Sequence, residues 1–259
     1  MQKQNRTEVI DPVVDQAIAE CADAVVDLQK KSFQPGLESF EQYAKKIRHK
    51  ISAMLHDFHT ACARGHKVLI DQIKKSSPEL FGQGELQNTL YPSRSIDDPE
   101  AFMQALSEGA SVYSLLGFSD EVMQRFYRAA AELLDEGKSG EAKEGFLFLT
   151  AIGPRVFEFW LGLGIAYTRL HELDSAIQAL GQAIDIHPQD IDGYLALAHV
   201  YVQKQDFNQA QHVCDIGLST VEAHKELPWA HELGAHLREV KQQLELMRNK
   251  SSSPTYLSE

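Results

Sequence analysis

Apolar residues recur at helical spacing along most of the chain, and no sustained stretch alternates with the period of two that marks a half-buried strand. A first apolar stripe runs from Ile10 to Leu28, and the Asp11-Pro12 pair suits a helix start. A second stripe runs from about residue 37 to 75. A helix of this length is expected to kink near Gly65 or to pair with another helix. The pattern predicts an all-α protein.

Helix-breaking residues divide the chain into regions. Proline and glycine recur every few positions between residues 77 and 98, which predicts a linker. A helix from Pro99 to about Leu116 is expected to open the domain that follows. The predicted order is a helical N-terminal extension over 1–76, the linker over 77–98, a repeat domain over 99–248, and a polar, disordered tail over 249–259.

A period of 34 residues organises the predicted domain. Small residues keep this register at two positions, with Ala130, Gly164 and Ala198 at one and Ala142, Ala176 and Ala210 at the other. This is the tetratricopeptide pattern. The small residue at the eighth position lets two helices approach, and the one at the twentieth lets the second helix press on the first.

The register also assigns boundaries and packing positions. Three repeats are expected over 123–156, 157–190 and 191–224, and an amphipathic helix over 227–247 is expected to cap the stack. Turns inside the repeats are expected near Gly137, His171 and Gln205. The residues predicted to pack the repeats internally are Ala130, Ala142, Trp160, Gly164, Tyr167, Ala176, Ala198, Tyr201 and Ala210.

A second apolar stripe lies beside the packing stripe on the first helix of each repeat. The fifth, ninth and twelfth residues are rotated by ~100° from the packing positions and share one side of the helix, which lines the concave surface of such stacks. We call this set the groove face: Tyr127, Ala131, Leu134, Leu161, Ile165, Thr168, Leu195, His199 and Val202. It is predicted to bind an extended peptide or a helix of another protein, unless the N-terminal helices or a dimer partner fill it.

Charge and composition exclude several functional classes. The 259 residues carry 37 acidic and 25 basic side chains, a net charge of -12, and this field repels phosphate backbones, so nucleic-acid binding is not expected. No run of apolar residues is long enough to span a membrane, and the polar start does not resemble a signal peptide. Three widely spaced cysteines fit reduced thiols, so a cytoplasmic protein is expected.

Candidate chemistry is sparse. His56, His59, Cys62 and His66 recur along the second apolar stripe, and two or three of them could share a metal, but no second ligand cluster accompanies them. His231 and His236 stand five residues apart, which is the wrong spacing for the zinc-protease motif. Basic groove residues that could clamp a peptide carboxylate are limited to Arg169 and Lys204. We therefore expect no enzyme activity, no metal and no cofactor.

Several strings around the repeats are similar to those of one known family. Pro99-Glu100-Ala101-Phe102-Met103 and Tyr113-Ser114-Leu115-Leu116 match the short helix and turn before that family's first repeat. Phe159-Trp160-Leu161-Gly162-Leu163-Gly164 is similar to its Phe-Phe-Leu-Gly-Leu-Gly run, the most specific string of the match. On these residues, the stretch from about 97 to 247 resembles the class II chaperones of bacterial type III secretion, the family of SycD and LcrH.

The resemblance implies an all-helical cup that keeps a hydrophobic translocator or effector soluble in the bacterial cytoplasm before export. It implies that Tyr127 lines the client groove, whereas Ser139 and Leu180 stand where the family often has aromatic residues. The N-terminal extension, which family members usually lack, is expected to form a homodimer, to regulate the groove or to contact another part of the export machinery. A general repeat scaffold that joins two proteins is the alternative.

Overall fold

The computed structural model describes residues 12–30, 39–81, 90, 99–223, 225–226 and 228–251. Described residues fall into two compact units, one before and one after the Ala63–Arg64 bond, and each is considered by itself. This division lies inside a helix, 13 residues before the predicted end of the extension at residue 76. The predicted tail from residue 252 onward and much of the predicted linker lie outside the described residues.

The first unit is a pair of helices. Helix α1 (Pro12–Lys30) lies antiparallel to the first part of α2 (Phe40–Ser76). Two contacts show this direction: Asp15 pairs with His56 at 3.4 Å, and Asp23 pairs with Arg48. Ile18, Ala22 and Val26 form one buried stripe of α1. These residues recur every four positions, the spacing that places side chains on one face of a helix.

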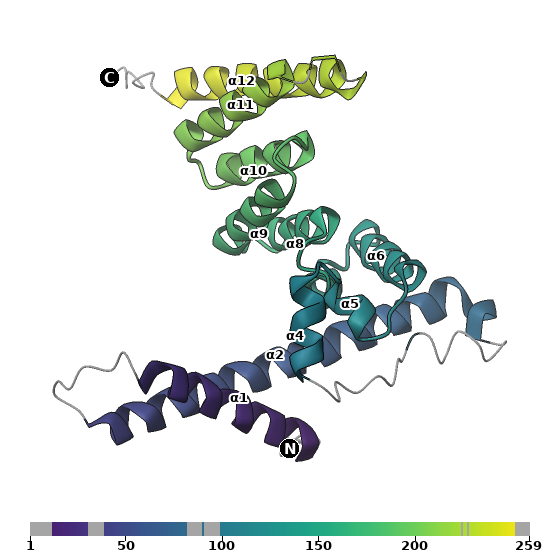
Figure 1. The fold of residues 1–259 in the computed structure, drawn as a ribbon. Helices are drawn as coiled ribbons and strands as arrows, with labels where there is room; N and C mark the ends of the chain where they lie inside the picture. Colours follow the sequence, from purple (N-terminus) through teal and green to yellow (C-terminus); the bar gives the residue numbers. More distant parts are fainter. Residues whose placement is uncertain are drawn as a thin grey trace, which may run out of the picture. The chain divides into compact units, whose positions relative to one another are not determined.

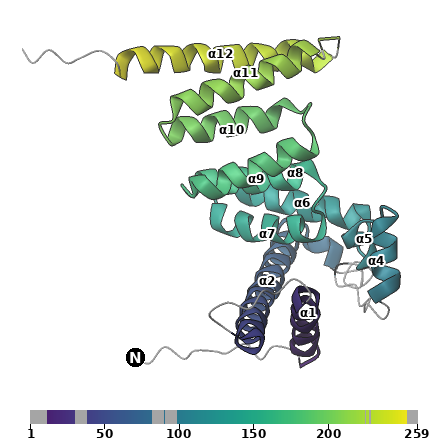
Figure 2. The same ribbon diagram turned by 60° about the vertical axis from the view of Figure 1, so that its left-hand side comes forward.

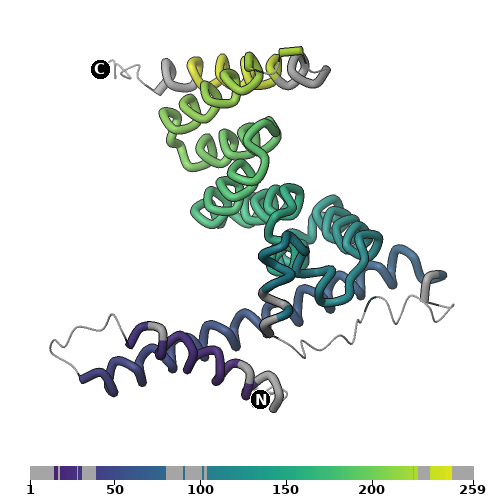
Figure 3. Tube along the Cα trace, viewed as in Figure 1, coloured from purple at the N-terminus to yellow at the C-terminus, as the bar shows by residue number. Residues whose placement is uncertain are grey.

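The second unit contains the repeats. Successive helices pack as antiparallel pairs, α6 with α7, α8 with α9, and α10 with α11, and α12 lies against α11 (Figures 1 and 2). The colour gradient in Figure 3 follows this order along the chain. The helix bounds are α6 (Asp120–Asp135), α7 (Ser139–Ile152), α8 (Phe157–Arg169), α9 (Leu173–Ile186), α10 (Ile191–Gln203), α11 (Phe207–Ala223) and α12 (Pro228–Ser251). The all-α fold with three repeats is confirmed.

The turn inside each repeat has the same geometry. Gly137, His171 and Gln205, which are 34 residues apart, have positive φ angles of 76°, 58° and 61°. Each lies at the end of a helix, where two backbone hydrogen bonds form a Schellman motif. In the first repeat, Gly137 N–H donates to the Leu134 carbonyl and Lys138 N–H donates to the Leu133 carbonyl. The turns predicted from the repeat register are therefore confirmed, although two of them use residues other than glycine.

The small residues of the repeat lie where helices meet. Ala130, Ala198, Ala142, Ala176 and Ala210 are all fully buried. A Cβ atom added to Gly164 would lie 2.5 Å from Leu180 Cδ2, so the eighth position of the second repeat faces its partner helix closely. The larger members of the predicted packing set, Trp160, Tyr167 and Tyr201, are half-buried.

The end of α2 belongs to the second unit and covers the first repeat. Leu69, Ile70 and Ile73 are buried there, and a Cβ atom on Gly65 would lie 2.2 Å from the Glu144 carbonyl oxygen of α7. The helix continues from Phe40 to Ser76, so Gly65 does not end it. Gly65 instead permits a close approach of two helix backbones, which any side chain would prevent. We call the described residues between Arg64 and Phe118 the cap.

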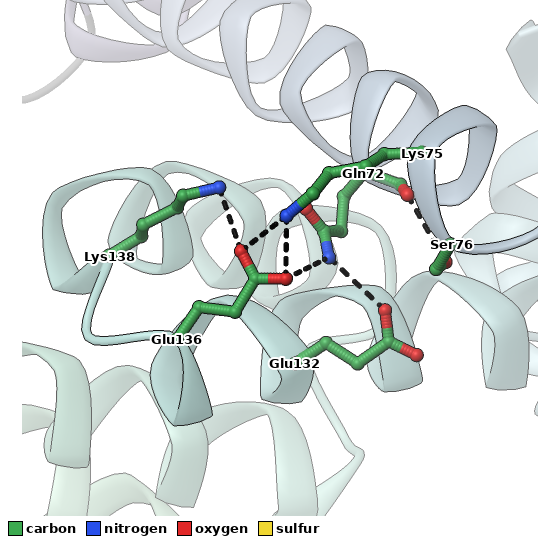
Figure 4. Close-up of polar contacts among 6 residues, drawn as sticks. All are labelled: Gln72, Lys75, Ser76, Glu132, Glu136 and Lys138. Atoms are coloured by element: carbon green, nitrogen blue, oxygen red, sulfur yellow. Dashed lines mark hydrogen bonds and ion pairs between the residues drawn. The ribbon is translucent and has the colours of Figure 1, made fainter.

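Aromatic and polar contacts hold the cap. The His66 ring lies 5.4 Å from the Phe126 ring and 5.1 Å from the Phe148 ring, between centroids. At the other end, Gln72 and Lys75 of α2 donate hydrogen bonds to Glu132 of α6 and to Glu136, the residue that follows this helix (Figure 4). We call Gln72, Lys75, Glu132, Glu136 and Lys138 the polar clasp.

The segment before the first repeat differs from its prediction. One helix was expected from Pro99 to Leu116, but the structure has two, α4 (Pro99–Ser107) and α5 (Val112–Leu115). The break falls at Gly109, which has a φ of 100°, and Ser111 then caps α5 by accepting a hydrogen bond from Ser114 N–H. Glycine and serine in these positions end one helix and start the next.

Candidate functional site

The groove face lies on α6, α8 and α10, the first helices of the three repeats. Tyr127, Ala131, Leu161, Ile165, Thr168, Leu195 and Val202 are half-buried, Leu134 is buried and His199 is exposed. Several of these side chains also pack against other residues inside the repeats. Leu161 packs beside Leu180 and Val200, and Leu195 and Val202 pack against the core of the third repeat. The groove face is therefore apolar and partly accessible.

The end of α2 lies away from the groove face on α6. Gln72 and Lys75 contact Glu132 and Glu136, whereas the groove face of this helix carries Tyr127, Ala131 and Leu134. Residues five apart are separated by about 140° around a helix, so Glu132 points well away from Tyr127. Residues 64–76 thus pack on another side of the first repeat and leave its groove face uncovered.

A cavity of about 370 Å³ opens beside Tyr127, and we call it the first-repeat pocket. The Tyr127 ring lies 6.1 Å from the Phe159 ring and 6.2 Å from the Phe146 ring, between centroids. The residues that line the pocket are Tyr113, Asp120, Met123, Gln124, Tyr127, Val156, Glu158 and Phe159. A second cavity of about 440 Å³ shares Tyr113 and Val156 with it and extends past α4 and α5.

The pKa values of two tyrosines in this pocket are raised, as expected for surroundings that are apolar and negatively charged. Burial raises the pKa of Tyr127, and the negative charge of Glu158 raises it further. The hydroxyl of Tyr113 donates a 2.8 Å hydrogen bond to Asp120 Oδ1, and this bond is the main cause of the raised pKa of Tyr113. Carboxylates therefore lie beside aromatic rings at the mouth of the pocket.

Of the residues that line this pocket, Tyr127 alone belongs to the groove face predicted from the sequence. Gln124 and Glu158 occupy the second position of their repeats, three residues before Tyr127 and Leu161. Positions two, five and nine share one helix face, because residues three and four apart are neighbours on a helix. The repeat register could therefore have included the second position. The contribution of Tyr113 depends on the turn at Gly109, which the 34-residue period does not describe.

The basic residues considered for a carboxylate clamp make other contacts. The Arg169 guanidinium donates to the Leu134 carbonyl, and Lys204 Nζ lies 2.6 Å from Asp174 Oδ1. Both cations are therefore used to join neighbouring helices of the stack.

The histidine and cysteine cluster is not assembled as a metal site. Within the described part of the chain, no group of three or more potential ligands is close enough to hold a metal ion. His56 pairs with Asp15, and burial raises the pKa of the Cys62 thiol to about 11, which disfavours the thiolate that metals bind. Across the described ranges, no helix combines the length and hydropathy of a membrane span.

Comparisons with known proteins agree with this geometry. Residues 167–220 match the tetratricopeptide repeat family, and no curated protein sequence matches the chain. A chain of a T3SS complex from Aeromonas hydrophila is 19% identical, with a TM-score of 0.52 over 58% of this chain and 98% of that chain. The type III secretion translocator chaperone SycD of Yersinia enterocolitica is 18% identical, with a TM-score of 0.49 over 52% and 98%.

PcrH from Pseudomonas aeruginosa is also similar, at 18% identity and a TM-score of 0.46 over 50% of this chain and 96% of that chain. At 19% identity and a TM-score of 0.52, the likeness to the chain of the T3SS complex shows a shared fold. The chain therefore carries tetratricopeptide repeats, in a domain with the fold of a chain from a type III secretion complex.

Proposed function

We propose that this protein is a cytoplasmic chaperone of type III secretion, which binds a hydrophobic translocator or effector along the groove face. The proposed role is binding without a chemical step. The observation that carries it is the row of half-buried apolar side chains on α8 and α10, with the first-repeat pocket at one end. Apolar side chains that stay partly accessible after the repeats have packed suit a polypeptide laid along the stack.

Two further observations support the type III secretion assignment. The sequence from about 97 to 247 resembles class II chaperones, and the fold is shared with a chain of a T3SS complex. A client that inserts into membranes exposes apolar surface before export, and an acidic chain with a net charge of -12 would keep the complex soluble. A client bound for export must also be released, which suits a groove of modest area.

The test is client solubility on co-expression. The client to be tested is a secreted protein with two long apolar segments, encoded beside the gene for this chain. Leu161→Glu and Ile165→Glu should each abolish its recovery in the soluble fraction, because a buried charge without a partner opposes docking. The helical circular dichroism of the chaperone should stay unchanged.

Ile216→Glu is the matched control, since Ile216 is an apolar residue of α11 that is 42% exposed and lies outside the groove face. A client that stays soluble with both groove variants would overturn the proposal. Equal loss with Ile216→Glu would point to general instability or to a scaffold that binds through another surface.

A further inference from the structure

The first-repeat pocket combines two kinds of wall. Its apolar wall includes the rings of Tyr113, Tyr127 and Phe159, and its polar wall includes the carboxylates of Asp120 and Glu158. An apolar pocket that served aliphatic side chains alone would gain nothing from carboxylates at its mouth, because each loses solvation when the pocket fills. Aromatic faces and carboxylates together attract an organic cation.

The two carboxylates of the pocket are not neutralised by ion pairs within the part of the chain that the structure describes. Among the described residues, neither Asp120 nor Glu158 takes part in an ion pair, although Asp120 accepts a hydrogen bond from the Tyr113 hydroxyl. Glu158 also adds to the negative field further along the stack. Burial raises the pKa of Asp190, and the charges of Asp192 and Glu158 raise it as well. Three carboxylates near the starts of α8 and α10 thus repel one another.

We propose that the first-repeat pocket binds an arginine side chain of the client segment, so that clients are selected for a cationic residue next to their apolar anchors. This inference rests on the proposed function and further specifies that the client segment carries a positive charge. A guanidinium fits the pocket better than an ammonium, because its flat face stacks on Tyr127 while its edge donates to Asp120 or Glu158. Neighbouring aliphatic residues of the client would lie along Leu161 and Ile165.

The probe is a blocked peptide, acetyl-Leu-Arg-Leu-amide, compared with the same peptide in which citrulline replaces arginine. Citrulline keeps the shape of arginine and removes its charge. Dissociation constants are measured on the full chain by nuclear magnetic resonance titration, at low and at high salt. The arginine peptide should bind about 10-fold more tightly at low salt, and the ratio should shrink at high salt.

Variants then locate the charge effect. In the double variant Asp120→Asn with Glu158→Gln, the arginine peptide should lose about 10-fold in affinity, and the citrulline peptide should bind as before. The control is Asp185→Asn with Glu141→Gln, which removes two exposed carboxylates elsewhere and should keep the tenfold ratio. Tyr127→Leu should weaken the arginine peptide more than the citrulline peptide, because it removes the ring face.

Equal affinity for the two peptides in the wild-type chain would overturn the inference, as would a ratio that survives in the double variant. An arginine peptide that binds only adventitiously would keep its affinity in both double variants, which also contradicts the pocket. The proposed function fails separately, by its own test with Leu161→Glu and the full client. A groove that holds the client but shows no preference for arginine would thus remove this inference alone.

Discussion

The three repeats and the cap that precedes them are built on different principles. The repeats, over 123–224, use one residue pattern three times, with small residues where helices cross and the same turn at Gly137, His171 and Gln205. The described residues of the cap use contacts that occur once, such as the aromatic ring group around His66 and the polar clasp. A periodic pattern can be detected in the sequence alone, whereas contacts that occur once can be found only in the three-dimensional structure.

Close approach of helices shows the difference most clearly. In the second repeat, a Cβ atom on Gly164 would lie 2.5 Å from both Cγ and Cδ2 of the fully buried Leu180 side chain, so this side chain would have to shift. In the cap, a Cβ atom on Gly65 would lie 2.2 Å from the backbone carbonyl oxygen of Glu144, so the two helices themselves would have to move apart. The other two repeats have alanine at the position of Gly164, namely Ala130 and Ala198, whereas the backbone contact of Gly65 occurs once.

The largest expected effect tests whether the cap belongs to the folded core of the repeats. Leu69→Ala removes a fully buried side chain that lies against Gly145 of α7 and should lower the free energy of unfolding by about 3 kcal/mol. Urea denaturation followed by circular dichroism measures it. The control Leu246→Ala, at a residue of α12 that is 57% exposed, should change stability by less than about 0.5 kcal/mol. Equal effects of the two variants would mean that the end of α2 is not part of this core.

The two close approaches give a matched pair of variants. Gly65→Ala should lower the free energy of unfolding by about 1–3 kcal/mol, because the helices must move apart. Gly164→Ala should lower it by less than Gly65→Ala does, because it displaces the Leu180 side chain and not a helix backbone, and because alanine favours the helix over glycine by about 1 kcal/mol. Thermal or urea unfolding ranks the pair. The opposite order would contradict the contrast between a helix–backbone contact in the cap and a side-chain contact in the repeat.

The shared turns of the repeats predict a gain in stability. His171 has a φ of 58°, a conformation that costs a residue with a side chain more than glycine. His171→Gly should therefore raise the free energy of unfolding by about 0.5–1 kcal/mol, and Gly137→Ala should lower it by a similar amount. If His171→Gly proves destabilising, the histidine side chain contributes contacts that outweigh the backbone conformation.

The polar clasp should give the smallest effect and a distinct dependence on pH. Hydrogen bonds from Lys138, Lys75 and Gln72 lower the pKa of Glu136 to about 2, from an ordinary value of 4.5. A lowered pKa in the folded state means that the clasp stabilises above pH 4.5, and that this stabilisation is lost as the pH falls toward 2.

Glu136→Gln should thus be slightly less stable than the wild type at pH 7, and the difference should vanish between pH 4.5 and 2. Urea midpoints measured across this range provide the test, with Asp185→Asn as a control whose difference from wild type should show no such loss. A difference for Glu136→Gln that is independent of pH would show that the charge of Glu136 does not hold the cap.

The contrast also explains what the sequence could predict. The all-α fold, the three repeats and their turns could be predicted from residue spacing alone, because each repeat position occurs three times in the sequence. Of the first-repeat pocket, only Tyr127 was predicted as a groove residue. Asp120 and Tyr113 come from the segment before the repeats, which the 34-residue period does not cover. The docking of residues 64–76 could not be predicted, because the contact of Gly65 with Glu144 joins positions that no local pattern relates.

The central claim is that another polypeptide lies along the groove face, and photo-crosslinking tests it most directly. A benzophenone amino acid replaces Ile165 on the groove face or Ile216 on α11, and each variant is co-expressed with the hydrophobic client and irradiated. A crosslinked chaperone–client product from position 165, with little or none from position 216, is the predicted result. A product from position 216 with none from 165 would contradict the account.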